Sequence, residues 1–256
     1  MPKLLAVGCS WTDQNYNTPV NDEHGIKTWP TLLGESLGYE TVNMGISGSG
    51  NNSIMKQAIN GIHRENPDLI CVLWSNQGRI DLWNFEHLLP FNLFFGNIQN
   101  IERWSSLTQK FAATMVRRLI HDEEDLNVID EFFRNMFILN DIATHRNIPI
   151  YFGTAIKIWP HTHYKVQSKN VDEVKRYKRF MKEWIRNSYF NEFDKKKYKE
   201  KIIGWPWLEE MGGFTMEEFL KDKDRNPIHR ISAEDEHPNA KGHEVIANEF
   251  LKKIKI

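Results

Sequence analysis

Short runs of apolar residues recur along the first 150 residues of the chain, and stretches with helical spacing separate them. The runs have the length of buried strands and cover residues 4–9, 68–74 and 148–153, and residues 40–43 are predicted to form a further short strand. Continuously apolar strands are typical of a parallel sheet covered on both faces, and parallel strands need a crossover connection between them. This alternation predicts an α/β fold with a mainly parallel sheet.

Four segments have the apolar periodicity of amphipathic helices. They cover residues 28–37, 51–63, 126–145 and 242–254, and a further helix candidate lies at 107–121. The first three of the four lie between predicted strands, as the helices of crossover connections do.

Two long stretches exceed what a minimal fold of this kind needs. Residues 78–124 are rich in aromatic side chains and contain a turn-like segment at 92–97, and residues 155–230 form a second excursion. Neither stretch contains a repeat or a low-complexity linker that would separate two domains. We therefore expect one domain over residues 1–256 that carries two insertions.

The charge balance excludes one class of partner. The 256 residues include 34 acidic and 33 basic side chains, a formal net charge of −1 with histidine neutral. Proteins that bind nucleic acid through charge have a large basic excess, so nucleic acid is not an expected partner. Residues 165–201 are a local exception, with thirteen Lys and Arg against six Asp and Glu. A helix with a solvated basic face is favoured there, and an anionic ligand is the alternative.

The cysteines and the N-terminal residues bear on the compartment. Cys9 and Cys71 both lie in predicted buried strands, where free core thiols are favoured over a disulfide. The N-terminal apolar run is too short for a signal peptide, and no segment has the about 18 apolar residues of a membrane span. We expect a soluble protein that is cytoplasmic or associated with a viral particle.

Polar residues follow the predicted strands at the edge where parallel sheets bind ligands, which is the carboxyl end of the strands. Ser10 follows the first strand, a glycine-rich loop with Gly48 follows the second, and Asn76 follows the third. A fourth polar segment, Asp-Glu-His-Pro-Asn-Ala-Lys-Gly-His at residues 235–243, precedes the last helix. Each segment alone has an ordinary structural explanation as a cap or a turn.

Together these segments resemble the four sequence blocks of the SGNH (GDSL-type) hydrolase superfamily, which supply Ser, Gly, Asn and His in this order. The resemblance covers residues 3–81 and the chain from 234 onward. It implies a three-layer α/β/α sandwich with a flavodoxin-like sheet. It also implies that Ser10 is the nucleophile and His237 its general base. The backbone N–H groups of Ser10 and Gly48 and the side-chain amide of Asn76 would form the oxyanion hole.

The implied roles fit the chemistry of ester hydrolysis. A serine hydroxyl is a weak nucleophile until an imidazole takes its proton, and the imidazole needs an acceptor that fixes its tautomer. Two carboxylates lie just upstream of His237: Glu234, at the three-residue spacing common in the family, and Asp235, at the alternative spacing of two. We favour Asp235. The negative charge that develops on the carbonyl oxygen needs preorganised N–H donors.

The sequence departs from the family pattern in two blocks. Cys9 stands where the first block has Asp, and residues 74–77 read Trp-Ser-Asn-Gln where the third block has Gly-x-Asn-Asp. Neither difference removes an atom that the chemistry needs.

The nine tryptophans indicate a class of substrate. Trp11 follows the first strand, and Trp83, Trp159, Trp205 and Trp207 lie in the insertions, near the expected site. Flat aromatic faces are common in ligand pockets and suit sugar rings. We expect the first three of these tryptophans to bind substrate.

A metal site is not expected. His161 and His163 alternate as two ligands on a strand would, but no acidic or cysteine partner lies at a ligand spacing. A solvated loop is the favoured interpretation of this pair.

The expected activity is that of a serine esterase without metal or organic cofactor. The favoured target is an O-acetyl group on a glycan or a similar polar substrate, and the two insertions would form a cap over the site. Two alternatives stay open. One is an esterase or thioesterase for lipid-type acyl groups, and the other is a binding or structural protein that keeps the fold without catalysis.

Overall fold

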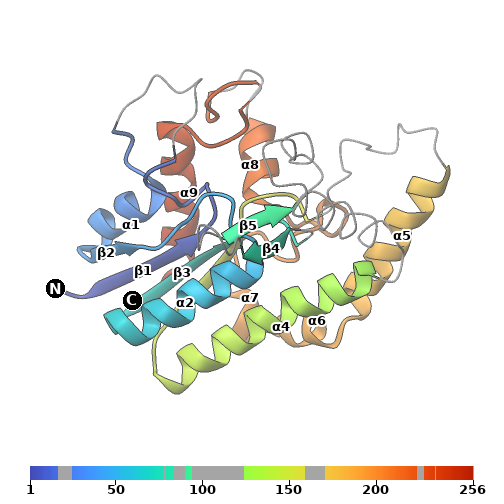
Figure 1. Cartoon of the computed structure of the whole chain (residues 1–256), viewed down its shortest axis with the longest axis horizontal. Helices are drawn as coiled ribbons and strands as arrows, with labels where there is room; N and C mark the ends of the chain where they lie inside the picture. Colours follow the sequence, from blue (N-terminus) through green and yellow to red (C-terminus); the bar gives the residue numbers. More distant parts are fainter. Residues whose placement is uncertain are drawn as a thin grey trace.

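A parallel sheet with helices on both faces forms the centre of the protein (Figure 1). The computed structural model describes residues 1–16, 25–77, 79–83, 90–93, 124–158, 171–223, 228–233 and 235–255. The sheet has the strand order β2-β1-β3-β6, and every pair is parallel. Its strands are β1 Lys3–Gly8, β2 Glu40–Asn43, β3 Leu69–Trp74 and β6 Ile150–Thr154. This order is that of a flavodoxin-like sheet, so the predicted fold class is confirmed.

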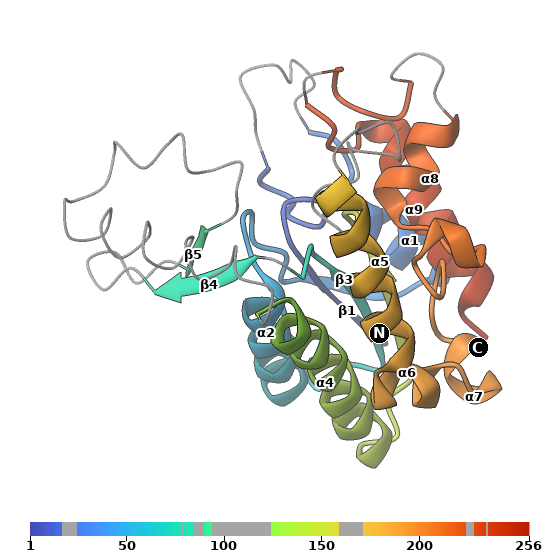
Figure 2. The same ribbon diagram turned by 90° about the vertical axis from the view of Figure 1, so that its right-hand side faces the viewer.

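Helices cover the two faces of the sheet in pairs (Figures 1 and 2). Helices α1 Trp29–Leu37 and α9 Ala240–Lys253 pack together on one face, where the rings of Trp29 and Phe250 stack with centroids 4.6 Å apart. Helices α2 Asn51–Glu65 and α4 Glu124–His145 pack together on the other. All six residues of β3 are buried between these layers, as its continuously apolar sequence predicts.

The eight predicted core elements are present, and their ends differ from the prediction by small shifts. Strand β6 begins at Ile150 instead of residue 148, because residues 147 and 148 form the cap that follows α4. Asn147 has a φ of 58°, and the Ile148 N–H donates to the Ala143 carbonyl, which is a left-handed helix end. Helix α9 begins at Ala240 because the Asn239 side chain accepts from the Gly242 N–H and caps it.

The first insertion contains an antiparallel hairpin of β4 Ile80–Trp83 and β5 Pro90–Leu93. The sequence predicted a turn from residue 92 onward, which is wrong for residues 92 and 93 because they pair with β4. The helix candidate at 107–121 lies outside the described residues.

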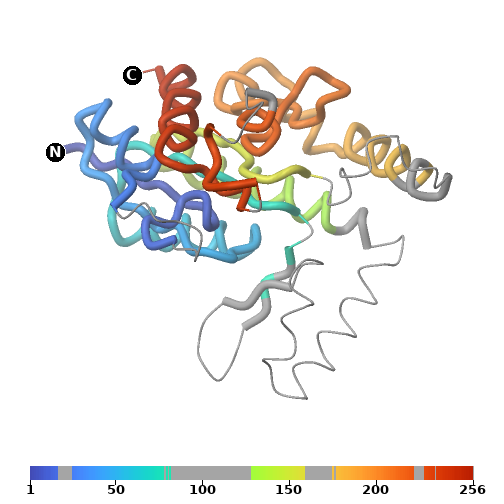
Figure 3. The backbone as a smooth tube through the Cα atoms, turned by 90° about the horizontal axis from the view of Figure 1, so that it is seen from above, coloured from blue at the N-terminus to red at the C-terminus, as the bar shows by residue number. Residues whose placement is uncertain are grey.

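The second insertion adds helices to the core. These are α5 Val171–Arg186, α6 Ser188–Phe193, α7 Lys196–Lys199, the 3₁₀ turn η3 Glu209–Met211 and α8 Met216–Lys223. Helices α5 and α6 pack against α4, whereas α8 packs beside α9 (Figures 2 and 3).

An aromatic cluster joins this insertion to the sheet layer. The ring of Phe133 on α4 lies 4.5 Å from Trp184, 6.2 Å from Phe193 and 6.3 Å from Trp205, measured between centroids. Trp207 is only 2% exposed. Trp205 and Trp207 therefore pack the insertion onto the core.

Helix α5 is amphipathic. Phe180 and Trp184 are buried, whereas exposed basic residues occupy its other side: Lys175, Lys178, Arg179, Lys182 and Arg186. Ile185 is 39% exposed. A helix with a solvated basic face is confirmed for these side chains, and an anionic ligand for it stays a prediction.

Two further expectations can be compared with the structure. Cys9 and Cys71 are both buried and unbridged, as their place in apolar strands predicts. Among the helices that the structure describes, none combines the length and the apolar character that crossing a bilayer requires.

The aromatic cluster predicts how the second insertion contributes to stability. Trp184→Ala removes a fully buried indole and is expected to lower the free energy of unfolding by about 3–5 kcal/mol. Ile185→Ala, one residue further on the same helix, should cost less than about 1 kcal/mol because its side chain is partly exposed. Urea unfolding of both variants measures the difference. If Trp184→Ala lowers the free energy of unfolding no more than Ile185→Ala does, the second insertion is not part of the core.

Candidate active site

Three predicted side chains lie in one hydrogen-bonded row at the carboxyl edge of the sheet. The Ser10 Oγ lies 2.7 Å from His237 Nε2, and His237 Nδ1 lies 2.6 Å from Asp235 Oδ1. This pattern assigns the Nδ1 hydrogen to the bond with Asp235 and leaves Nε2 to accept the Ser10 hydroxyl proton. Serine, imidazole and carboxylate thus have the mutual geometry of a nucleophile, its base and the group that orients the base.

The end of β1 places the serine. Cys9 and Ser10 follow Gly8, and the Cys9 carbonyl accepts the N–H groups of Thr12 and Asp13 at 2.8 and 3.1 Å. The chain therefore turns sharply at the strand end, and the serine side chain is held there with only 6% of its surface exposed.

The loop before α9 places His237 and Asp235. The Asp235 N–H donates to Ser232 Oγ at 2.9 Å, and the His237 carbonyl accepts the Ile231 N–H at 2.9 Å. The Asn239 amide donates to two carbonyls of residues 228–230. A short antiparallel bridge between residues 230 and 238 closes the loop. The bonds of Pro238 and Asn239 thus fix the backbone that carries the His237 side chain.

Tyr16 is a member of this site that the sequence did not reveal. Its hydroxyl donates to Asp235 Oδ2 at 3.2 Å and lies 2.9 Å from His237 Nδ1. Its ring stacks on the imidazole with centroids 4.1 Å apart. Burial and the neighbouring Asp235 carboxylate raise the pKa of the Tyr16 hydroxyl, so Tyr16 stays a donor that holds the carboxylate in place.

The protonation of the imidazole follows from its surroundings. Burial lowers the pKa of His237 although the hydrogen bond and charge of Asp235 act to raise it, and the positive charge of Arg79 lowers it further. The ring is therefore neutral at neutral pH, which is the state that a general base requires. Burial and the charge of His237 lower the pKa of His243 to about 3.

The loop after β2 lies against the serine turn. The Asp13 carboxylate accepts the Ser47 N–H at 2.9 Å and the Ser47 hydroxyl at 2.6 Å, and the Asn43 amide donates to the Thr12 carbonyl at 2.7 Å. A Cβ at Gly45 would meet the backbone of Thr12 and Asp13 at 2.6 Å. Only glycine permits this approach.

Gly48 and Asn76, the two further residues predicted as oxyanion donors, follow the two strands that pair with β1 in the sheet. Gly48 has a φ of 81°, a left-handed conformation that glycine adopts without strain. Asn76 follows β3, and its Nδ2 donates to the Lys157 carbonyl at 2.5 Å. The turn of Gly48 therefore follows β2 and the amide of Asn76 follows β3, both at the carboxyl edge of the sheet where Ser10 follows β1.

A carboxylate from the first insertion supports this region. The Asp81 carboxylate accepts the N–H groups of Gly50 and Ser53, both at 2.8 Å, at the start of α2. A negative charge at a helix N-terminus stabilises the helix, and here the carboxylate comes from β4. No local pattern in the sequence joins residue 81 to residues 50–53, so this contact was not predicted.

Of the three tryptophans predicted to bind substrate, the structure describes the side chain of Trp11 only. Trp11 is 2% exposed, with its ring centroid 6.2 Å from that of His237. It lies beside the site but offers no open face, because the protein covers it. Trp159, Glu234, His161 and His163 lie outside the described residues, as does the side chain of Trp83.

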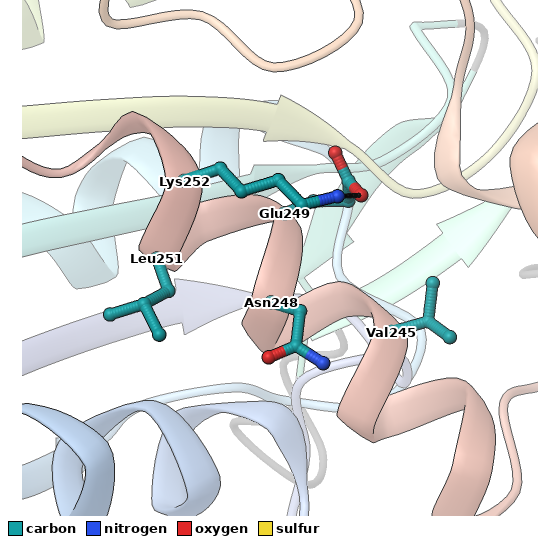
Figure 4. Close-up of a pocket in the computed structure, with 5 residues that line it drawn as sticks. All are labelled: Val245, Asn248, Glu249, Leu251 and Lys252. Carbon is teal, nitrogen blue, oxygen red and sulfur yellow. Dashed lines mark hydrogen bonds and ion pairs between the residues drawn. The ribbon is translucent and has the colours of Figure 1, made fainter.

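A separate depression lies on the surface of α9 (Figure 4). Its lining comes from the middle and end of that helix: Val245, Asn248, Glu249, Leu251 and Lys252. The Glu249–Lys252 ion pair, 2.6 Å long, spans part of it. The row of Ser10, His237 and Asp235 contributes nothing to this lining.

Comparisons with known proteins bear on the fold. No family model and no curated protein matches the chain. The chain is similar to two solved structures of Axe2 from Geobacillus stearothermophilus. One is a variant described as an acetyl-xylooligosaccharide esterase, with a TM-score of 0.51. The other is described as an acetylxylan esterase, with a TM-score of 0.50. Both are 16% identical, over 100% of this chain and 94% of theirs.

A lipolytic protein of the G-D-S-L family from Desulfitobacterium hafniense DCB-2 is more distant. It has a TM-score of 0.47 at 12% identity, over 99% of this chain and 100% of that chain. At these identities the Axe2 structures show a shared fold.

The environment of His237 predicts a titration that is independent of any activity. In a ¹⁵N–¹H spectrum, the His237 ring should titrate below the ordinary value of about 6.5, because burial lowers its pKa. Asp235→Asn should move this titration to still lower pH, since the carboxylate acts to raise the pKa. His243, with a pKa of about 3, should stay neutral and serves as the internal control. A His237 titration that moves upward in Asp235→Asn would contradict the assigned geometry.

Proposed function

The chain has the α/β fold of the SGNH hydrolases, and we propose that it is a serine esterase that works through an acyl-enzyme intermediate. The observation that carries this proposal is the row of Ser10, His237 and Asp235, with contacts of 2.7 and 2.6 Å. A neutral, buried imidazole between a serine hydroxyl and a carboxylate activates the serine as a nucleophile.

In the acylation step, Ser10 Oγ attacks the carbonyl carbon of the ester. The hydroxyl proton passes to His237 Nε2, and Asp235 stabilises the imidazolium that results. The tetrahedral intermediate then expels the alcohol, which takes the proton from His237. The acyl group stays on Ser10 as an ester.

In the deacylation step, a water molecule replaces the alcohol. His237 takes a proton from the water as its oxygen attacks the acyl carbon. The second intermediate releases Ser10, which recovers its proton from His237, and the carboxylic acid leaves. The net reaction is the hydrolysis of one ester bond, and no cofactor enters it.

In both steps, negative charge develops on the carbonyl oxygen. The proposed donors to it are the backbone N–H groups of Ser10 and Gly48 and the side chain of Asn76. The Asn76 side-chain amide nitrogen carries two hydrogens. One of them is donated to the Lys157 carbonyl, and the proposal assigns the other to the oxyanion. Each such donor lowers the barrier by about 2.7–4 kcal/mol.

The proposed substrate is an O-acetyl ester of a glycan or another polar compound. Polar side chains surround the serine turn in the described residues, among them Asp13, Ser47 and Asn43. The Axe2 structures with the same fold are described as acetylxylan and acetyl-xylooligosaccharide esterases. Long acyl chains and thioesters are the rival substrates. A catalytically silent role is disfavoured, because it predicts a displaced His237.

Ser10→Ala is expected to lower kcat on an activated acetyl ester by more than about 1,000-fold, because no other group replaces the nucleophile. Labelling by a fluorophosphonate probe should disappear in the same variant. Ser36→Ala, which alters an exposed hydroxyl on α1 bonded to the Leu32 carbonyl, is the matched control and should keep both signals. Turnover or labelling that persists in Ser10→Ala would remove Ser10 as the nucleophile.

Two substitutions identify the carboxylate that orients His237. Asp235→Asn keeps the size of the side chain but removes the charge, and we expect kcat to fall by roughly 10²–10⁴-fold. Glu234→Gln should change kcat by less than about threefold. Steady-state kinetics on the same acetyl ester decide between them. A larger loss in Glu234→Gln would assign the orienting role to Glu234.

A further inference from the structure

Helix α8, which belongs to the second insertion, contacts two segments next to the candidate site. One contains Lys157, which is bonded to Asn76, and the other contains Glu236, which lies between Asp235 and His237. The helix begins with a capping arrangement in which the Thr215 N–H and hydroxyl donate to Glu218 Oε2 at 3.0 and 3.1 Å. Glu217, the second residue of α8, is only 7% exposed although it carries a carboxyl group. A buried carboxyl needs specific partners, and its partners lead in two directions.

In the first direction, Glu217 connects to Asn76. The Glu217 carboxyl accepts the Lys157 N–H at 2.9 Å through Oε2, and the Lys157 carbonyl accepts from Asn76 Nδ2 at 2.5 Å. The Lys157 ammonium lies 3.5 Å from Glu218 Oε1, which fixes the same residue to α8 a second time. The peptide groups on either side of Lys157 therefore link the buried carboxyl to the proposed oxyanion donor.

In the second direction, Glu217 connects to the segment that carries the base. The Glu217 and Glu236 carboxyls lie close enough for each to shift the pKa of the other. Glu236 also lies 2.6 Å from Lys221 Nζ and 3.4 Å from the Arg230 guanidinium. Glu236 is the residue between Asp235 and His237, so α8 holds the backbone of the orienting acid and the base.

Two carboxyls can share a hydrogen bond only when one of them keeps its proton. Burial acts to raise the pKa of Glu236, but the hydrogen bond and charge of Lys221 and the charge of Arg230 hold it below its ordinary value. Burial raises the pKa of Glu217 against the bond from the Lys157 N–H, and the Glu236 carboxylate raises it further. Of the two carboxyls, Glu217 therefore keeps its proton to the higher pH.

We propose that Glu217 is a positioning residue for the esterase, which joins α8 and the Glu236 segment bound to it to the Lys157–Asn76 pair. This inference rests on the proposed function, since it assigns Glu217 an effect on Asn76 as an oxyanion donor. Through α8, the second insertion thus contributes to the position of the proposed oxyanion donor.

The proposal gives the rate a dependence on pH. When Glu217 loses its proton, two carboxylates face each other, and their repulsion weakens the link between Glu217 and the Glu236 segment. The ion pair of Lys221 with Glu236 remains. The other charged groups around Glu217 and Glu236 are the Lys157 and Lys221 ammonium groups, the Arg230 guanidinium and the Glu218 carboxylate. Because the pKa of Glu217 is raised, activity falls as pH rises through that pKa.

The test compares Glu217→Gln and Glu217→Leu with the control Glu192→Gln. Glu192 lies on α6, and its carboxylate pairs with Lys195. Gln keeps an acceptor for the Lys157 N–H and a donor for Glu236, so kcat should stay within about threefold of wild type and the alkaline fall should vanish. Leu offers neither, and kcat should fall by on the order of 10- to 100-fold while KM changes little. The control should match wild type in kcat, KM and pH profile.

A second measurement does not depend on turnover. The Asn76 side-chain amide signals in a ¹⁵N–¹H spectrum should shift in Glu217→Leu, and should be restored in Glu217→Gln. The proposal is overturned if Glu217→Leu leaves kcat and the Asn76 signals unchanged, or if Glu217→Gln fails to restore them. Wild-type protein that hydrolyses no ester would refute the proposed function instead, while the Asn76 signals would still report on the link to Glu217.

Discussion

The position of β1 between β2 and β3 is the constraint on which the rest of the structure depends. All strand pairs around β1 are parallel, so the three strands end at the same edge. The turn with Ser10, the loop with Gly48 and the amide of Asn76 follow these ends and therefore lie at one edge of the sheet. Hydrogen bonds between the serine turn and the loop after β2 add to this placement. His237 and Asp235 come from the other end of the chain, and α9 carries them to this edge by packing on α1.

The insertions are structural parts of the site rather than additions to its surface. Asp81 from the first insertion holds the start of α2, and α8 from the second holds Lys157 and Glu236. Helices α5 and α6 extend the layer of α4 through the aromatic cluster around Phe133. Much of the tryptophan surplus is thus explained by core packing, and the choice of substrate rests on the polar surroundings of Ser10 instead.

The sequence predicted what depends on local patterns. Continuously apolar strands and helical periodicity gave the order of the elements, and residues next to strand ends gave Ser10, Gly48 and Asn76. The contacts that were missed depend on residues distant in sequence. Tyr16 lies in a stretch without periodicity, and Glu217 meets Lys157 and Glu236 only after α8 has packed. Trp11 was misjudged because a strand-end indole can be either covered or open, and only packing decides.

Mass spectrometry of the protein during turnover shows directly whether Ser10 forms a covalent acyl-enzyme. The wild-type chain is mixed rapidly with an activated acetyl ester, quenched in acid and digested. The peptide that contains Ser10 is expected to gain one acetyl mass, and this acetylated form should decay as the ester is consumed. Turnover with no acetylated peptide, or with the acetyl group on a different residue, would contradict the proposed role of Ser10.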